Sequence, residues 1–149
     1  MNLHPVTDDL ADRFLNDLVD EVRPKRVEDV VRMLMVLPEY RHAASNNNPP
    51  DVYVGDRKRR AGEIVLEMTG GTAGPKKMYE KFADAGVGTV VFMHIPEGHL
   101  EVARDQHLNV VIAGHMATDS LGINLLADRS EEKGLRITPC SGLIRAKRM

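Results

Sequence analysis

Cysteine, tryptophan and long apolar runs are scarce in this sequence. Its 149 residues include one cysteine, Cys140, and no tryptophan, and aromatic residues make up only 4%. A single cysteine excludes an intramolecular disulfide and a cysteine-rich zinc site. So few aromatic rings argue against a stacking platform for single-stranded nucleic acid. No apolar run approaches the roughly 20 residues of a membrane-spanning helix, and the amino terminus lacks the apolar core of a signal peptide. We therefore expect a soluble, cytoplasmic protein with no membrane partner.

The charges are almost balanced, with 20 Lys and Arg against 22 Asp and Glu. A net charge of −2 provides no general attraction for polyanions, so a nucleic-acid partner is not expected. The basic run from Arg57 to Arg60 is typical of a solvated turn, although a contact with phosphate remains an alternative. The length and the 42% hydrophobic content predict one folded domain with a real core.

The amino-terminal part is predicted to be helical. Residues 8–22 have apolar side chains at helical spacing, with Thr7 as a candidate cap and Pro24 beyond the end. Residues 27–37 form a second amphipathic segment that stops at Pro38. The Asn- and Pro-rich stretch 45–50 marks a linker. We therefore divide the chain into a helical arm, 1–48, and a second part, 49–149.

Beyond the linker, the pattern changes to alternating strands and helices. Two short strands, 52–54 and 63–68, flank a polar turn and predict a β-hairpin. The segments that follow are predicted helices at 75–85, 99–107 and 121–133, and predicted strands at 89–93, 109–113 and 135–138. Alternation of this kind is typical of an α/β fold, here a layered α/β sandwich with a mostly parallel sheet.

Polar residues of the metal-ligand type follow the apolar strand 109–113. His115 comes directly after Gly114, and Asp119 lies four residues later. If the chain is helical there, the imidazole and the carboxylate converge and can share one cation. The alternative is that His115 makes a loop hydrogen bond and Asp119 caps a helix.

A second polar group follows the strand 89–93. His94, Glu97 and His99 lie in this loop or just beyond it. Parallel strands end at the same edge of a sheet, where α/β proteins usually place their chemistry. We therefore predict that the strands ending at Met93 and Ala113 lie side by side, with His94 and His99 near the site. Capping and surface exposure are the alternative roles of these two histidines.

A glycine-rich turn joins the strand 63–68 to the next helix. Its sequence, TGGTAGPKK over residues 69–77, could cradle phosphate with backbone N–H groups, supported by Lys76 and Lys77. The spacing is not that of a P-loop, because Pro75 stands where that motif has lysine. A plain strand-to-helix turn is the alternative.

Three stretches resemble the NIF-three-like family (NGG-one interacting factor three, also named GTP cyclohydrolase I type-two homologues). GHMATDSLG at 114–122 is similar to the family's GH-x-A-T-E motif, and MHIPEGHLEVARDQHLNVVIAGH at 93–115 leads into it. RRAGEIVLEMTGGTAGPKKMYEKFADAGVGTVV at 59–91 is similar to the glycine-rich opening of the family's second lobe. The chain thus resembles a second lobe and the segment before it, and we expect either a fragment or a reduced natural form.

The resemblance implies a dinuclear metal site to which His115 and the acid four residues later contribute. That acid is Asp119 here, where the family usually has Glu. HPVTDD at 4–9 is similar to the family's HTPADN, which implies that Asp8 is a metal ligand. Glu97 lies near the site in this comparison, while the adjacent histidine pair of the first lobe is absent from the sequence. The resemblance also implies a homo-oligomer.

Three functional hypotheses follow. In the first, Asp8, His115 and Asp119 bind a divalent metal (zinc, manganese or iron) that activates water to hydrolyse a small or nucleotide-like substrate, with Glu97 as the catalytic base. In the second, the protein is a metal-binding interaction or regulatory module without turnover. In the third, the turn at 69–77 binds phosphate or nucleotide.

Overall fold

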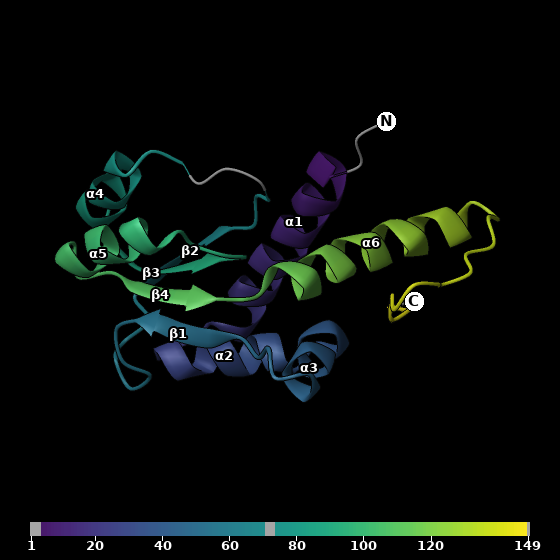
Figure 1. The fold of residues 1–149 in the computed structure, drawn as a ribbon, viewed down its shortest axis with the longest axis horizontal. Coiled ribbons are helices and arrows are strands. Elements are labelled where there is room, and N and C mark those ends of the chain that lie inside the picture. The colour runs from purple at the N-terminus through teal and green to yellow at the C-terminus, as the bar shows by residue number, and fades with distance from the viewer. Residues whose placement is uncertain (1–3, 71–73, 149) are drawn as a thin grey trace.

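The computed structural model describes residues 4–70 and 74–148, which form helices and a four-stranded sheet (Figure 1). The elements in chain order are α1 (His4–Val22), α2 (Val27–Met35), α3 (Pro38–Ser45), β1 (Asp51–Val54), β2 (Glu63–Glu67), α4 (Lys77–Asp84), β3 (Val87–Phe92), α5 (Glu97–Asp105), β4 (Asn109–Ile112) and α6 (His115–Glu132). Three helices come first, and helices and strands alternate only from β2 onward. No helix in the described ranges is long and apolar enough to cross a membrane.

The sheet has the strand order β1-β4-β3-β2 and is mostly parallel. β2 pairs with β3 and β3 pairs with β4 in parallel, whereas β1 pairs with β4 antiparallel at one edge. Every residue of the central strand β4 is buried, as expected for a strand covered on both faces. The α/β class and the mostly parallel sheet are therefore confirmed.

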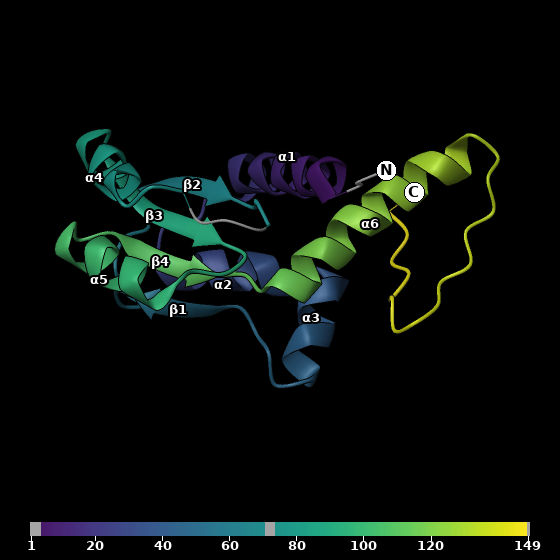
Figure 2. The ribbon, with the colours of Figure 1, turned by 45° about the horizontal axis from the view of Figure 1, so that its top comes forward.

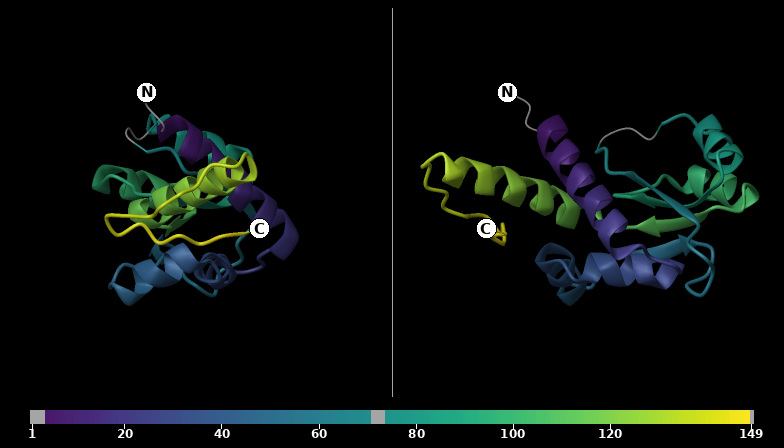
Figure 3. Two further views of the ribbon diagram at one scale, coloured as in Figure 1. Left: turned by 90° about the vertical axis from the view of Figure 1, so that its right-hand side faces the viewer. Right: turned by 180° about the vertical axis from the view of Figure 1, so that it is seen from behind.

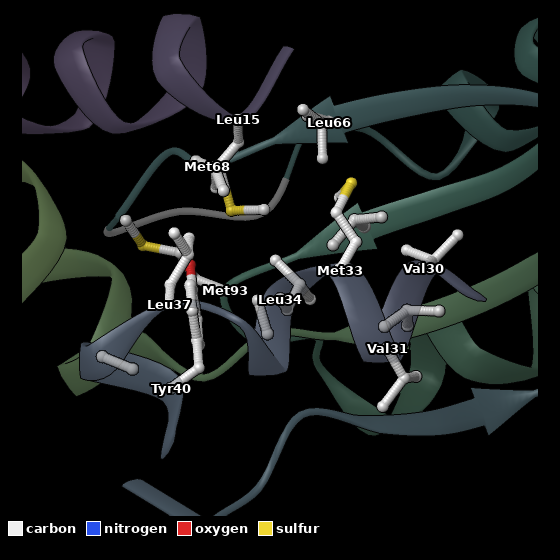
Figure 4. Packing of buried hydrophobic residues seen from close by; sticks show 14 of the residues in the cluster. Leu15, Val30, Val31, Met33, Leu34, Leu37, Tyr40, Leu66, Met68 and Met93 are labelled. Atoms are coloured by element: carbon white, nitrogen blue, oxygen red, sulfur yellow. The ribbon is translucent and has the colours of Figure 1, made fainter. Parts of the chain in front are cut away.

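Helices cover both faces of the sheet. Alternate residues divide between the faces: Val91 and Val111 pack with α1 and α2, while Val90 and Val110 pack with the α4 and α5 side. Figure 4 shows the first cluster, in which Leu15 of α1 and other fully buried side chains meet the sheet. This cluster contains residues from both sides of the proposed boundary at residue 48, so the helices and the sheet share one core.

The predicted hairpin is wrong, because β1 and β2 lie at opposite edges of the sheet. The connecting segment 55–62 instead crosses beneath the amino ends of β4 and β3. A Cβ on Gly55 would lie 2.4 Å from the Asn109 side chain, and a Cβ on Gly88 would lie 2.5 Å from the Ala61 carbonyl oxygen. Thr89 also donates a hydrogen bond to that oxygen, at 2.6 Å. These close contacts hold the segment across the edge of the sheet and separate the two strands.

The prediction of a strand at 135–138 is also wrong. The 18-residue helix α6 runs away from the sheet, so the chain after it emerges where there is no strand edge to join (Figure 2). Each of the five predicted helices also differs from the structure at one limit or more, and α3 was not predicted. α1 includes Thr7, which is therefore no cap. α2 ends at Met35, before the predicted stop, and Pro38 begins α3 instead. α6 starts at His115 rather than at 121.

Candidate metal site

The carboxyl ends of β3 and β4 lie side by side, as predicted. Their pairing continues past the strands, since Ala113 donates to the Phe92 carbonyl at 2.8 Å and Gly114 donates to Met93 at 3.2 Å. The next side chains meet in space: the rings of His94 and His115 are stacked, with centroids 5.2 Å apart and an interplanar angle of 19°. Both loops therefore open at one edge of the sheet.

The chain turns directly from β4 into α6 at Gly114, whose φ of 100° favours glycine. Helical geometry then brings His115 and Asp119 together, with Nε2 and Oδ2 3.2 Å apart. The first turn is anchored from below by Thr118, which is fully buried. The Thr118 hydroxyl donates to the Gly114 carbonyl at 2.8 Å and lies 2.9 Å from the Tyr40 hydroxyl. The side chains of His115 and Asp119 therefore converge, as predicted for a helix. His115 does not lie in a loop and Asp119 does not cap a helix, because both residues belong to α6.

The His115–Asp119 pair has the geometry and chemistry of two metal ligands. Ligands at about 2.0–2.2 Å from a tetrahedral zinc ion lie roughly 3.3 Å from each other, close to the separation of Nε2 and Oδ2. The second carboxylate oxygen, Oδ1 of Asp119, is buried and accepts no hydrogen bond from the described residues. An unsatisfied buried carboxylate oxygen is costly, and a cation would satisfy it. The two residues therefore fit a divalent metal.

Asp8 lies on a neighbouring element. It is 8% exposed, and its Oδ2 accepts a hydrogen bond from the Gly70 backbone N–H at 3.0 Å, just past the end of β2. Seen from behind, α1 crosses the junction between the sheet and α6 (Figure 3, right). Among the described residues, however, no three His, Cys, Asp or Glu side chains are grouped closely enough to hold a metal. The structure joins His115 to Asp119 but does not add Asp8 to the pair.

Of the other predicted site residues, His94 lies against the His115–Asp119 pair, whereas His99 and Glu97 make no described contact with it. His94 contacts His115, as described above. His99 instead faces α4, where its Nδ1 lies 3.2 Å from the Tyr79 hydroxyl. Glu97 is an exposed first residue of α5 and forms no hydrogen bond or ion pair with any residue the structure describes. A carboxylate in a first helical turn is favoured by the helix dipole, which accounts for Glu97 without a catalytic role.

Two further acidic residues, Glu67 and Asp12, lie at this edge and were not predicted from the sequence. Glu67 ends β2 and accepts a hydrogen bond from Thr69, and it lines a small cleft together with His94. Asp12 of α1 borders a second cleft of about 280 Å³ beside Asp8. Burial raises the pKa of Asp12; the Met68 backbone N–H opposes this shift, and Glu67 adds to it. The sequence signal for Glu67 was an acid near the carboxyl end of the predicted strand 63–68, at the edge where the candidate ligands lie, whereas nothing in the sequence pointed to Asp12.

The glycine-rich turn can be described only in part. Residues 71–73 lie outside the described residues, so phosphate binding there stays a prediction. Of its two lysines, Lys77 begins α4 and Lys76 precedes it as the N-cap residue.

Comparisons with known proteins give two similar structures. No protein-family model and no curated protein matches the chain. A NIF3 superfamily protein from Sphaerobacter thermophilus has a TM-score of 0.67 and 29% sequence identity, over 89% of this chain and 48% of that one. A Bacillus cereus protein related to NIF3 has a TM-score of 0.42 and 16% identity, over 72% of this chain and 28% of that one. The chain thus spans about half the length of the first structure.

Proposed function

Because this chain is a NIF3-like protein, we propose that it binds one divalent metal ion through His115 and Asp119 and acts as a metal-binding module. The observation that carries this proposal is the 3.2 Å separation of Nε2 and Oδ2 at the carboxyl edge of the sheet. A nitrogen ligand beside a carboxylate suits zinc, manganese or iron. Asp8 is proposed as a further ligand, on the same edge of the sheet, where its Oδ2 accepts a hydrogen bond from the Gly70 N–H.

The surrounding residues prepare the pair for a cation. Asp119 supplies carboxylate oxygens, and His115 supplies a ring nitrogen. The ring of His94 lies flat against that of His115 and limits its rotation. Thr118 and Tyr40 fix the first turn of α6, so that both ligands project from a rigid element, which favours metal affinity.

A hydrolase would require more than these residues supply. A bound divalent ion polarises a carbonyl or phosphoryl oxygen. A base must then take a proton from the attacking water, and the candidate for this role is Glu97. Glu97 makes no described contact with the His115–Asp119 pair, and this separation favours the non-catalytic module over the hydrolase. A Glu97→Gln variant that abolished a metal-dependent hydrolysis would reverse this preference.

Calorimetric titration of metal-free protein with zinc and with manganese tests the proposal. We expect weak binding of about one ion per chain, and a loss of at least tenfold in affinity in His115→Ala and in Asp119→Ala. His107→Asn is the matched control. It removes an imidazole at the opposite end of β4, from a position with φ of 57° that Asn tolerates. Unchanged binding in His115→Ala would overturn the assignment, and two tightly bound ions per chain would exclude a single incomplete site.

A further inference from the structure

Two basic segments that are distant in sequence lie side by side at the amino end of the sheet. The first comprises residues 23–26, between α1 and α2, and the second comprises residues 57–60, in the segment that crosses beneath β4 and β3. Backbone hydrogen bonds join them: Val27 donates to the Arg59 carbonyl at 3.0 Å, and Ala61 donates to the Lys25 carbonyl at 2.9 Å. Arg26 and Arg60 form an antiparallel bridge between the segments.

We call these two segments the basic ridge. Its side chains bring seven positive charges together, and all seven residues are exposed: Arg23, Lys25, Arg26, Arg57, Lys58, Arg59 and Arg60. Arg57 pairs with Asp51. The other six form no ion pair with any described residue. Three of these six use a side-chain N–H on a carbonyl oxygen, which leaves their charge uncompensated.

Asp29, Glu28 and Asp56 lie close to the ridge but bond to backbone N–H groups or to Arg32, not to the charged side chains of the ridge. Asp29 accepts hydrogen bonds from the backbone of Lys25 and Arg26 and also pairs with Arg32. Glu28 pairs with Arg32 as well. Asp56 accepts from the Lys58 backbone N–H at 2.7 Å. The positive charge of the ridge is therefore available to an external anion, although the whole chain is slightly negative.

The ridge is held rigidly by the sheet below it. The Asn109 side chain donates to the Arg60 carbonyl at 3.2 Å. Asn109 starts β4, whereas His115 follows the end of that strand, so the ridge and the candidate metal site lie at opposite ends of β4. An anion held at the ridge does not contact the metal site.

We propose that the basic ridge binds the sugar-phosphate backbone of nucleic acid without reading its sequence. Four of the six uncompensated cations are arginines, whose planar guanidinium donates two hydrogen bonds to one phosphate. The second segment is a turn, in which the Arg59 N–H donates to the Asp56 carbonyl at 3.0 Å, so its cations gather in one place beside those of the first segment. A duplex carries one charge for about every 1.7 Å of its axis, so neighbouring phosphates are close enough together to meet several of these cations. The ridge contains no aromatic side chain, so it contacts phosphates rather than bases. Single strands and duplexes should therefore both bind.

Fluorescence anisotropy with a labelled 20-nucleotide DNA strand and its duplex tests this proposal. Lys58→Glu/Arg60→Glu reverses two charges whose side chains make no described contact, so folding is preserved. We expect this variant to bind at least tenfold more weakly than the unaltered protein at 50 mM salt. The slope of log affinity against log salt should also become less steep by roughly two, about one for each lost phosphate contact. Lys25→Glu alone should weaken binding too, because it lies on the other segment.

Arg41→Glu/Arg129→Glu is the matched control, because the side chains of both residues, like those of Lys58 and Arg60, make no described contact. Both residues are exposed helix positions off the ridge, and this variant has the same net charge as the ridge variant. It should bind at least fivefold more tightly than the ridge variant. Equal weakening of the two variants would overturn the proposal, as would binding only to vesicles of anionic phospholipid. Addition of EDTA should leave DNA affinity unchanged, which separates the ridge from the proposed metal module.

Discussion

The carboxylate of Glu39 lies 2.6 Å from the guanidinium of Arg148, and the Glu39 side chain is completely buried. The two residues are 109 positions apart. Asn124 of α6 donates to the other oxygen of Glu39 at 2.8 Å and also to the Ile144 carbonyl. This network fastens the carboxyl-terminal segment across α3 and α6.

Arg148→Ala should lower the free energy of unfolding by about 3–5 kcal/mol, because it leaves the buried Glu39 carboxylate without its cation. Urea unfolding followed by circular dichroism measures the loss. Lys147→Ala is the control, since Lys147 pairs with Glu131 at 2.9 Å on the surface and should contribute less than about 1 kcal/mol. When Glu39→Gln is combined with Arg148→Ala, the double variant should recover part of the stability lost in Arg148→Ala alone. Equal losses in the two single variants would contradict this account.

Gly122 is required where α6 packs on α1. A Cβ at this position would lie 2.3 Å from the Thr7 carbonyl oxygen. Gly122→Ala should therefore destabilise the fold by about 1–3 kcal/mol. Gly98→Ala in α5 meets only the flexible end of Lys76 and should be neutral or stabilising, because Ala favours a helix over Gly. Thermal melts of the two variants compare these outcomes, and an unaltered Gly122→Ala melting temperature would disprove the close contact.

His94 is expected to position His115 rather than to bind metal itself. His94→Ala should weaken zinc binding by about tenfold through loss of the stacked ring, the lower end of effects typical for groups that orient a ligand. His94→Phe, which keeps a flat ring and removes both nitrogens, should restore most of the affinity. If His94→Phe binds as weakly as His94→Ala, then His94 is a ligand. Calorimetric titration separates the two roles.

Asp12 should make the stability depend on pH. Its pKa in the folded state is raised above the ordinary value of 3.8, chiefly by burial. A raised pKa means that ionised Asp12 opposes folding at neutral pH, and that this cost disappears as the pH falls through the raised pKa towards 3.8. Asp12→Asn should therefore stabilise the protein at pH 7, and the gain should shrink near pH 4.

Urea unfolding at the two pH values measures this effect. Asp17→Asn removes the same charge from an exposed position of α1 and controls for net charge. A loss of stability at pH 7 in Asp12→Asn would contradict the expected sign.

Local patterns in the sequence were sufficient to predict the two central strands, β3 and β4. The β-branched runs that became β3 and β4 are apolar over nearly every residue, so burial on both faces leaves little alternative to a central strand. Their alternation with helices implied parallel pairing, and parallel pairing brought His94 and His115 to one edge. Four-residue spacing brings the side chains of His115 and Asp119 together once the chain is helical. The positive φ of Gly114 allows that helix to begin directly at His115.

Only the tertiary structure decided which distant segments meet. The polar segment 55–62 has the composition of a hairpin turn, but its contacts with Thr89 and Asn109 direct it across the sheet edge. The same contacts place Arg57 to Arg60 beside residues 23–26 and create a charged ridge that the net charge conceals. The position of Asp8 beside Gly70 depends on how α1 packs on α6. The local sequence shows the hydrophobic periodicity of a segment, and hence whether it forms a helix or a strand. It does not show which other segment packs against it, because that is fixed by contacts between residues far apart in the chain.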